Sequence, residues 1–208
     1  MKTLYTNGSR TIIALNVKEA KSQNSKSGKH QIVLKDGDTS VFFTDNQPGN
    51  GLASRIDKLA ERQSIIGANL IVDATRGDNG VLMANAFSFG RNMFQMKNGE
   101  NTEYVFVGYP TNTRNWGEND KNFSFRMAVE RWDSIKKERK TVWYEMSFTD
   151  IADTARKLIG ADFKGLVAVH AKTVSEREAK NANGTPRLDE NGEQIVYRTA
   201  YADEITLI

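Results

Sequence analysis

An arginine interrupts an otherwise apolar, strand-like segment in the second half of the chain. Alternation along residues 123–132 predicts one face of core side chains, formed by Phe125, Met127 and Val129. The other face then carries Ser124, Arg126, Ala128, Glu130 and Trp132. A guanidinium at the centre of an outward face is what a cationic binding surface would contain, so we take Arg126 as a candidate contact to an anionic partner.

The segment that follows, residues 141–148, predicts a second face of the same kind. Its two alternating sets are Val142, Tyr144 and Met146 against Trp143, Glu145 and Ser147. We expect Met146 to point inward and Trp143 outward. Taken alone, a tryptophan is more often a core or interface residue than a binding platform. The outward position is therefore what makes Trp143 a candidate.

Short β segments separated by Gly, Asn and Asp turns make up both halves of the chain. The predicted strands are 11–17, 32–35, 41–44, 69–74 and 81–89 in the first half, and 104–107, 123–132, 141–148, 166–172 and 195–207 in the second. Helical spacing predicts a helix within 51–67, and another that begins at an N-cap Asp150 and ends at Gly160. Five strands with a helix between the third and fourth is the OB-fold order. We therefore predict an all-β protein with one helix per domain, built of two tandem OB-fold barrels over residues 1–98 and 99–208.

Short matches between the halves favour a duplication. Phe43-Thr44-Asp45 precedes the first helix as Phe148-Thr149-Asp150 precedes the second. Ile66-Gly67-Ala68 and Ile159-Gly160-Ala161 follow the two helices in the same way. The alternative is a single OB-fold that carries an unrelated N-terminal β domain. Asn98-Gly99 is a hairpin turn signal at the proposed boundary.

Composition excludes several classes of site. The chain has no cysteine and only two histidines, His30 and His170, which lie far apart in sequence, so we expect no metal or cofactor site. It contains no P-loop, G-x-S-x-G or H-E-x-x-H motif, so we expect no enzyme. The net charge is only +3, and the basic excess lies in the first 100 residues, with 13 Lys and Arg against 9 Asp and Glu.

Further candidate contacts lie in turn-rich sequence. In the second half they are Trp116 with Arg114 and Lys121, then Lys172 beside His170, and then Arg177, Lys180 and Arg187 around an Asn191-Gly192 turn. Trp116 is equally consistent with ligand contact and with loop packing, and His170 reads as an incidental outward residue. In the first half, Lys18, Lys21 and Lys29 lie in a Lys- and Ser-rich loop, where solvation and ligand binding are equally supported. Phe42 and Phe43 take opposite faces of one strand, so one belongs to the core and the other is a candidate platform; Phe43 is kept among the candidates.

Four motifs in the second half resemble, in order and spacing, the bacterial and phage single-stranded DNA-binding (SSB) family. The stretch 125–132 is similar to the F-x-L-A-V second strand of the family, and Thr141-Val142-Trp143-Tyr144 to its T-x-W/F third strand. Residues 164–169, KGLVAV, resemble the K-G-x-x-V-x-V entry to strand four, and Tyr197-Arg198-Thr199 the Y-x-T of the last strand. The resemblance covers roughly 100 residues and implies an OB-fold that stacks aromatic rings on bases and contacts phosphates with Lys and Arg.

Carried onto this chain, the resemblance implies that Trp132 and Trp143 stack on DNA. Phe148 resembles a third stacking aromatic, but strand alternation turns it inward unless a bulge intervenes. The segment 175–194 has no aromatic residue where the family commonly has one, so we expect it to contact phosphates instead. The chain ends in Asp203-Glu204-Ile205-Thr206-Leu207-Ile208 without the acidic recruiting tail of cellular members, which favours a phage or plasmid type.

These features predict sequence-tolerant binding of single-stranded DNA in replication or recombination. The alternative is an RNA-binding or protein-interaction OB module, because the fold hosts all three. No apolar run is long enough to span a membrane and the N-terminus has no apolar signal region, so we expect a cytoplasmic protein, in the host cytoplasm if phage-encoded. Replication or recombination proteins are expected partners, and two units per chain fit either a monomer or a homodimer.

Overall fold

The computed structural model of the chain describes residues 1–98, 100–133, 136–160 and 162–208, apart from the side chains of residues 98, 132 and 133. It divides into two compact units, residues 1–90 with Ile208 and residues 91–207, and we treat each by itself. Within the described residues, no helix is both long enough and apolar enough to cross a membrane.

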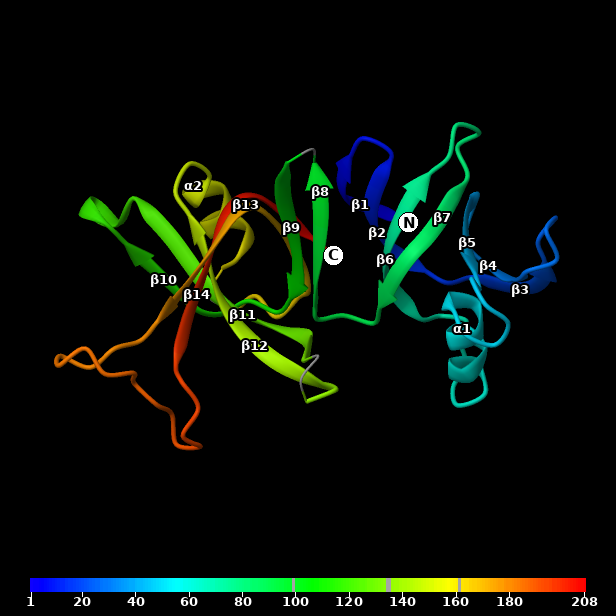
Figure 1. Cartoon of the computed structure of the whole chain (residues 1–208). Helices are drawn as coiled ribbons and strands as arrows, with labels where there is room; N and C mark the ends of the chain where they lie inside the picture. The colour runs from blue at the N-terminus through cyan, green and yellow to red at the C-terminus, as the bar shows by residue number, and fades with distance from the viewer. Residues whose placement is uncertain (99, 134–135, 161) are drawn as a thin grey trace. The chain divides into compact units, whose positions relative to one another are not determined.

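The second unit is a seven-stranded sheet with one short α-helix (Figure 1). Its elements are β8 (Asn92–Asn98), β9 (Asn101–Gly108), β10 (Thr111–Trp116), a 3-10 turn η1 (Glu118–Asp120), β11 (Asn122–Asp133), β12 (Glu138–Phe148), α2 (Ala152–Leu158), β13 (Val167–Glu178) and β14 (Val196–Leu207). The strand order is β10-β11-β12-β14-β13-β9-β8. β12 and β14 pair in parallel, and the other neighbours pair antiparallel.

The first unit has the same order of elements. They are β1 (Lys2–Asn7), β2 (Arg10–Asn16), β3 (Glu19–Asn24), β4 (His30–Asp36), β5 (Thr39–Thr44), α1 (Leu52–Ala60), β6 (Asn69–Arg76) and β7 (Leu82–Ser88). The strand order is β1-β2-β6-β7-β5-β4-β3, and β5 and β7 form the parallel pair. β1 to β7 therefore correspond one by one to β8 to β14, with α1 matching α2.

Three predictions about the fold need correction. Each sheet has seven strands where the sequence predicted five, because one further strand extends each edge: β1 and β3 in the first unit, β8 and β10 in the second. The second unit begins at Arg91, before the predicted boundary at 98/99, because β8 pairs with β9 in the second sheet. The predicted turn at the boundary therefore lies inside a hairpin, where Asn98 pairs with Asn101, and Gly99 is outside the described residues.

The helices begin differently from the prediction. The N-cap of α2 is Ile151 and has no side-chain hydrogen bond, so Asp150 is not the cap. At α1 the cap is Gly51, and the backbone N–H of Ser54 donates to Oδ1 of Asp45 at 3.0 Å. A Cβ on Gly51 would lie 2.6 Å from the Asp45 Cα, so only glycine allows this close approach.

Strand alternation sorts the second unit into a core and an outer face as predicted. Phe125, Met127, Val142 and Met146 are buried in one apolar cluster, which α2 and β13 also line. Phe148, a candidate stacking residue, is fully buried in this cluster, with its ring 5.3 Å from that of Phe125. Without a bulge between β11 and β12, alternation holds through residue 148 and turns this ring inward.

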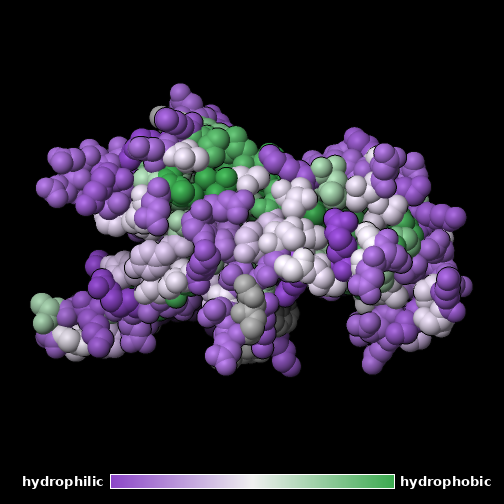
Figure 2. All heavy atoms as spheres, turned by 90° about the horizontal axis from the view of Figure 1, so that it is seen from above, coloured by the Kyte–Doolittle hydropathy of each residue, from purple (hydrophilic) through white to green (hydrophobic). Residues whose placement is uncertain are grey.

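The core of the first unit holds the corresponding phenylalanine. Phe43 is fully buried and packs edge-on against Phe87 at 5.7 Å. Its neighbour Phe42 points outward and is half-buried. Phe43 is therefore a core residue, and Phe42 is the outward member of the pair. Hydrophilic side chains cover most of the face in Figure 2, and the largest group of hydrophobic residues on that face lies over the second unit.

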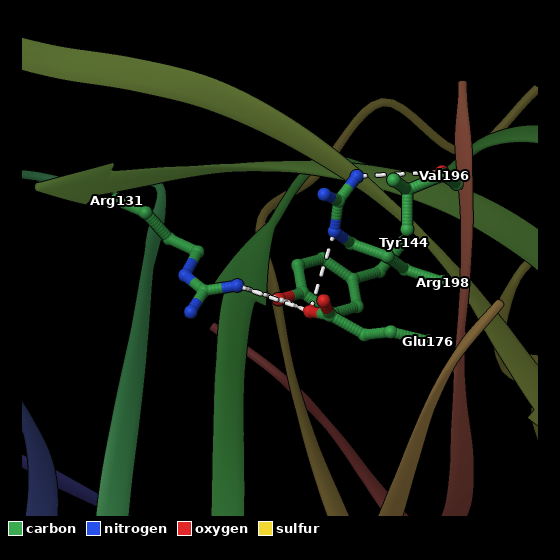
Figure 3. Close-up of polar contacts among 5 residues, drawn as sticks. All are labelled: Arg131, Tyr144, Glu176, Val196 and Arg198. Carbon is green, nitrogen blue, oxygen red and sulfur yellow. Dashed lines mark hydrogen bonds and ion pairs between the residues drawn. The ribbon is translucent and has the colours of Figure 1, made fainter. Parts of the chain in front are cut away.

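A polar cluster lies beside the core of the second unit and joins four strands (Figure 3). Arg131 of β11 donates to the Tyr144 hydroxyl at 2.9 Å and to Glu176 Oε1 at 3.1 Å. Arg198 of β14 donates to the same carboxylate oxygen at 3.3 Å. Burial raises the pKa of Tyr144 above its ordinary value. The cluster satisfies the polar end of a buried ring and ties β11, β12, β13 and β14 together.

The burial of Phe148 predicts a large loss of stability for Phe148→Ala. We expect the free energy of unfolding to fall by about 3–5 kcal/mol, because the substitution leaves a cavity in a packed core. Trp143→Ala on the same strand is the matched control, and we expect it to cost about 1 kcal/mol or less because that ring is half exposed. Urea denaturation measures both. Equal losses for the two variants would contradict the assignment of faces.

The Tyr144 cluster predicts a pH-dependent effect of Tyr144→Phe. At pH 7 the variant should lose about 1 kcal/mol of unfolding free energy, because it loses hydrogen bonds to Arg131 and Glu176. The raised pKa means that native Tyr144 stays protonated at a pH where the unfolded chain loses this proton. Its contribution is therefore complete below about pH 10 and is lost as the pH rises further. Urea denaturation from pH 7 to 11 should show the difference from wild type narrowing above pH 10, and a constant difference would refute the explanation.

Candidate nucleic-acid face

The outer face of the second unit consists of rows of side chains that cross five neighbouring strands. The ladder registers define the rows, because directly paired residues point to the same face. One row is Arg114, Ser124, Ser147, Tyr201 and Thr173, and the next is Thr111, Arg126, Glu145, Thr199 and Ser175. The third row lies two residues beyond the second on each strand. In it, Ala128 pairs with Trp143, and Tyr197 pairs with Arg177. Trp143 and Tyr197 each stand two residues before the Glu145–Thr199 pair, so they occupy equivalent places on their strands.

Three aromatic side chains on this face are about half exposed. The exposed fractions are 47% for Trp143, 46% for Tyr197 and 49% for Tyr201. The guanidinium of Arg126 lies 5.9 Å from the centre of the Trp143 ring, within range of a cation–π interaction. Among the described residues, no carboxylate forms an ion pair with Arg126, so its charge is available to an anion. The face thus combines exposed π surfaces with a positive charge beside one of them.

The cations at the β10 edge are more constrained. Arg114 donates to the Ser124 hydroxyl at 3.2 Å and forms an ion pair with Glu145, which holds it flat across the face. Trp116 stands two residues further along β10, on the same face, and is partly exposed. Arg156 of α2 holds the end of β10 and the turn η1 that follows it, by donating to Asn115 Oδ1 and to the Asp120 carbonyl, both at 2.9 Å. Lys121 lies exposed at the end of the loop.

The end of β13 and the segment between β13 and β14 carry the predicted cations, and in Figure 1 the orange loops of that segment extend away from the sheet. Arg177, Lys180 and Arg187 are all exposed, and none forms an ion pair with a carboxylate that the structure describes. Glu193 of that segment forms ion pairs with Lys136 at 2.8 Å, in the turn between β11 and β12, and with Lys140 of β12. These two lysines lower the pKa of Glu193 to about 2. Arg177 at the end of β13, and Lys180 and Arg187 in the segment, thus have no ion-pair partner among the described residues. An ion-pair network connects the segment to the neighbouring hairpin.

Lys172 and His170 depart from the prediction. His170 is 5% exposed, so it is a buried residue and not a surface one. Its Nδ1 lies 2.5 Å from Asp203 Oδ1, and Lys172 Nζ lies 2.9 Å from Oδ2 of the same carboxylate. The hydrogen bond to Asp203 raises the pKa of Lys172. Register shifts between residues 170 and 173 interrupt the alternation of β13. Thr173 lies on the outer face, whereas Lys172 is outside its rows and its charge is engaged by Asp203.

Trp132 cannot be assigned in the same way. Its backbone pairs with Arg139 in the β11–β12 ladder, and its side chain lies outside the described residues. The proposed stacking role of Trp132 stays a prediction. Phe148 is part of the core, as described above, and is not available on the face.

The first unit has an outer row at the corresponding positions. Lys21 pairs with Val33, Val33 with Phe42, Phe42 with Met83, and Met83 with Thr75. Lys21 thus corresponds to Arg114, Phe42 to Ser147 and Met83 to Tyr201. The lysine-rich stretch is a strand and not a loop: Lys18 and Lys29 lie beyond opposite ends of β3, about 20 Å apart along it. The structure therefore places only Lys21 of these three on the row.

Sequence reasoning missed Tyr197 and Tyr201 as face residues. In β14, Tyr197, Thr199 and Tyr201 alternate with Arg198, Ala200 and Ala202. Large rings on one side and small alanines on the other indicate that the alanines pack in the core, and Ala200 is indeed fully buried. This alternation in the sequence could have identified Tyr197 and Tyr201 as residues of the outer face. Across the described part of the chain, no group of three or more His, Cys, Asp or Glu residues is arranged to hold a metal ion.

Comparison with known proteins gives loose structural matches only. No protein-family model matches the chain, and no curated protein matches it. A small single-stranded DNA-binding protein from Streptomyces coelicolor is 16% identical, with a TM-score of 0.36, over 53% of this chain and 96% of that one. The Plasmodium falciparum SSB in complex with ssDNA is 17% identical, with a TM-score of 0.32, over 54% and 96%. The single-stranded DNA-binding protein of Thermus aquaticus is 8% identical, with a TM-score of 0.27, over 100% and 94%. These values are low, and we take no residue role from those proteins.

Proposed function

We propose that the chain binds single-stranded DNA without strong sequence preference, through the outer face of its second unit. The observation that carries the proposal is the set of half-exposed rings, Trp143, Tyr197 and Tyr201, on one sheet face with Arg126 and Arg177. Every base has a π face, so such rings stack on any sequence, and arginines beside them contact phosphates. Duplex DNA hides its base faces in the stack, so the same surface favours single strands.

The proposed role is binding and protection of single strands during replication or recombination, without catalysis. RNA is the nearest competitor, because stacking and phosphate contacts do not distinguish deoxyribose from ribose. We favour DNA because the sequence of the second half resembles the SSB family in its motifs. A parallel measurement with oligo-rU decides between the two, and tighter binding of oligo-rU would make the chain an RNA-binding protein.

Trp143→Ala should weaken the binding of oligo-dT by about 1–3 kcal/mol, because one base loses its stacking partner. This corresponds to about 5- to 150-fold in Kd. Quenching of tryptophan fluorescence on titration measures wild-type binding, and anisotropy of a labelled oligonucleotide compares the variants. Ile66→Ala, which removes an exposed apolar side chain after α1 in the first unit, is the control and should leave Kd unchanged. If wild-type protein fails to bind oligo-dT at low salt, the proposed function is wrong.

Arg126→Gln and Arg177→Gln should each reduce the salt dependence of binding. A plot of log K against log salt falls with a slope set by the number of phosphates contacted, so each variant should flatten the slope by about 0.7. Lys157→Gln is the control, because Lys157 is exposed on α2, which packs against the core and contributes no residue to the rows. An unchanged slope in both test variants would remove these arginines from the phosphate contacts.

A further inference from the structure

A second exposed pair of an aromatic ring and an arginine lies where β8 begins and β9 ends. Tyr109 is 45% exposed, and the Arg91 guanidinium lies 5.7 Å from the centre of its ring. Asn92 pairs with Val107, which brings the first residue of the unit next to the end of β9. Among the described residues, no carboxylate forms an ion pair with Arg91. Ring and charge are therefore both available to a ligand.

This pair lies beside the row that contains Trp143. A Cβ on Gly108 would be 2.6 Å from Met127 Cγ and 3.1 Å from the carbonyl oxygen of Ala128, so the end of β9 abuts β11 at that point. Ala128 is the register partner of Trp143 on the next strand. Tyr109, which follows Gly108 in the chain, is thus about two strand spacings from Trp143, roughly 10 Å. Ala128, which lies between them on β11, is itself buried.

The two pairs resemble each other and differ from the other ring–arginine contacts of the chain. Arg126 lies 5.9 Å from Trp143, and both members are exposed, as in the Arg91–Tyr109 pair. Arg55 lies 4.8 Å from Phe87, but that ring is buried and belongs to the core of the first unit. Arg156 likewise lies over Phe123, which is buried. Arg55 and Arg156 cover core rings, whereas Arg91 and Arg126 stand beside rings that solvent reaches.

We propose that Tyr109 and Arg91 form a second subsite, in which Tyr109 stacks on a base and Arg91 contacts a phosphate of the same single strand that binds at Trp143 and Arg126. This subsite rests on the proposed function and adds to it the direction in which the bound DNA strand runs across the sheet. The strand crosses the sheet from β12 over Ala128 toward the end of β9. A ligand that spans both subsites must be longer than one that reaches Trp143 alone.

The test compares oligo-dT of increasing length against wild type, Tyr109→Ala, Tyr109→Leu, Tyr109→Phe and Arg91→Gln. For long oligonucleotides, Tyr109→Ala and Tyr109→Leu should raise Kd by about 5- to 150-fold, because both remove the ring. Tyr109→Leu keeps apolar bulk and guards against a folding defect, and Tyr109→Phe should bind like wild type. Arg91→Gln should flatten the salt slope by about 0.7, with Lys157→Gln on α2 as the unaffected control. The shortest oligonucleotide that still quenches tryptophan fluorescence should bind all variants equally.

Photocrosslinking to oligonucleotides that contain bromodeoxyuridine gives a second readout on the unmodified protein. Crosslinks are expected on the peptide with Tyr109 as well as on that with Trp143. The subsite is overturned if Trp143→Ala weakens binding while the Tyr109 and Arg91 variants match wild type at every length, or if the Tyr109 peptide carries no crosslink. If wild type binds no single strand at all, the proposed function fails first, so the two failures are distinguishable.

Discussion

The antiparallel ladder between β11 and β12 constrains the second unit more than any other contact. It pairs Phe123 with Phe148 and continues without a register shift to Asp133 and Glu138. Phe125 pairs with Met146, and both point into the core. Ala128 and Trp143 must then point outward, because the side-chain period of a strand is two. A slip of one residue would bury Arg126 without a partner and expose the ring of Phe125, which costs free energy on both counts. The register that builds the core therefore also builds the candidate face.

This coupling explains why sequence alone predicted the central strands and the inward or outward position of Trp143 and Phe148. Apolar residues at alternate positions mark a strand that is buried on one side. Two of the four missed edge strands, β3 and β10, lack that mark. Every residue of β10 is exposed, and β3 has no buried residue, so neither contains a hydrophobic period. Such polar edges also discourage pairing with other chains, which is a reason for their composition. β8 was missed although it buries Phe94 and Met96 at alternate positions.

The candidate site was harder to predict than the fold, because a sequence counts charges but does not show which of them are paired. Arg114 and Lys172 are equally basic in sequence, yet Glu145 and Asp203 engage them in the folded chain. Arg126 has no such partner among the described residues. His170 was read as a surface residue from its place in the alternation, but it is buried beside Asp203. Pairing of this kind depends on residues more than 30 positions apart, which no local pattern contains.

The two units show which positions the shared topology leaves free to change. Phe43 and Phe148 fill corresponding core positions, and both are fully buried. On the outer rows the framework is kept while the side chains differ: the middle strand carries Phe42 in one unit and Ser147 in the other, and the following strand carries Met83 and Tyr201. Outward positions do not enter the packing of the core, so they vary without loss of the fold. The apolar contact surface of each row can then move from one strand to the next, while the cation at the edge, Lys21 or Arg114, stays at its place in the register.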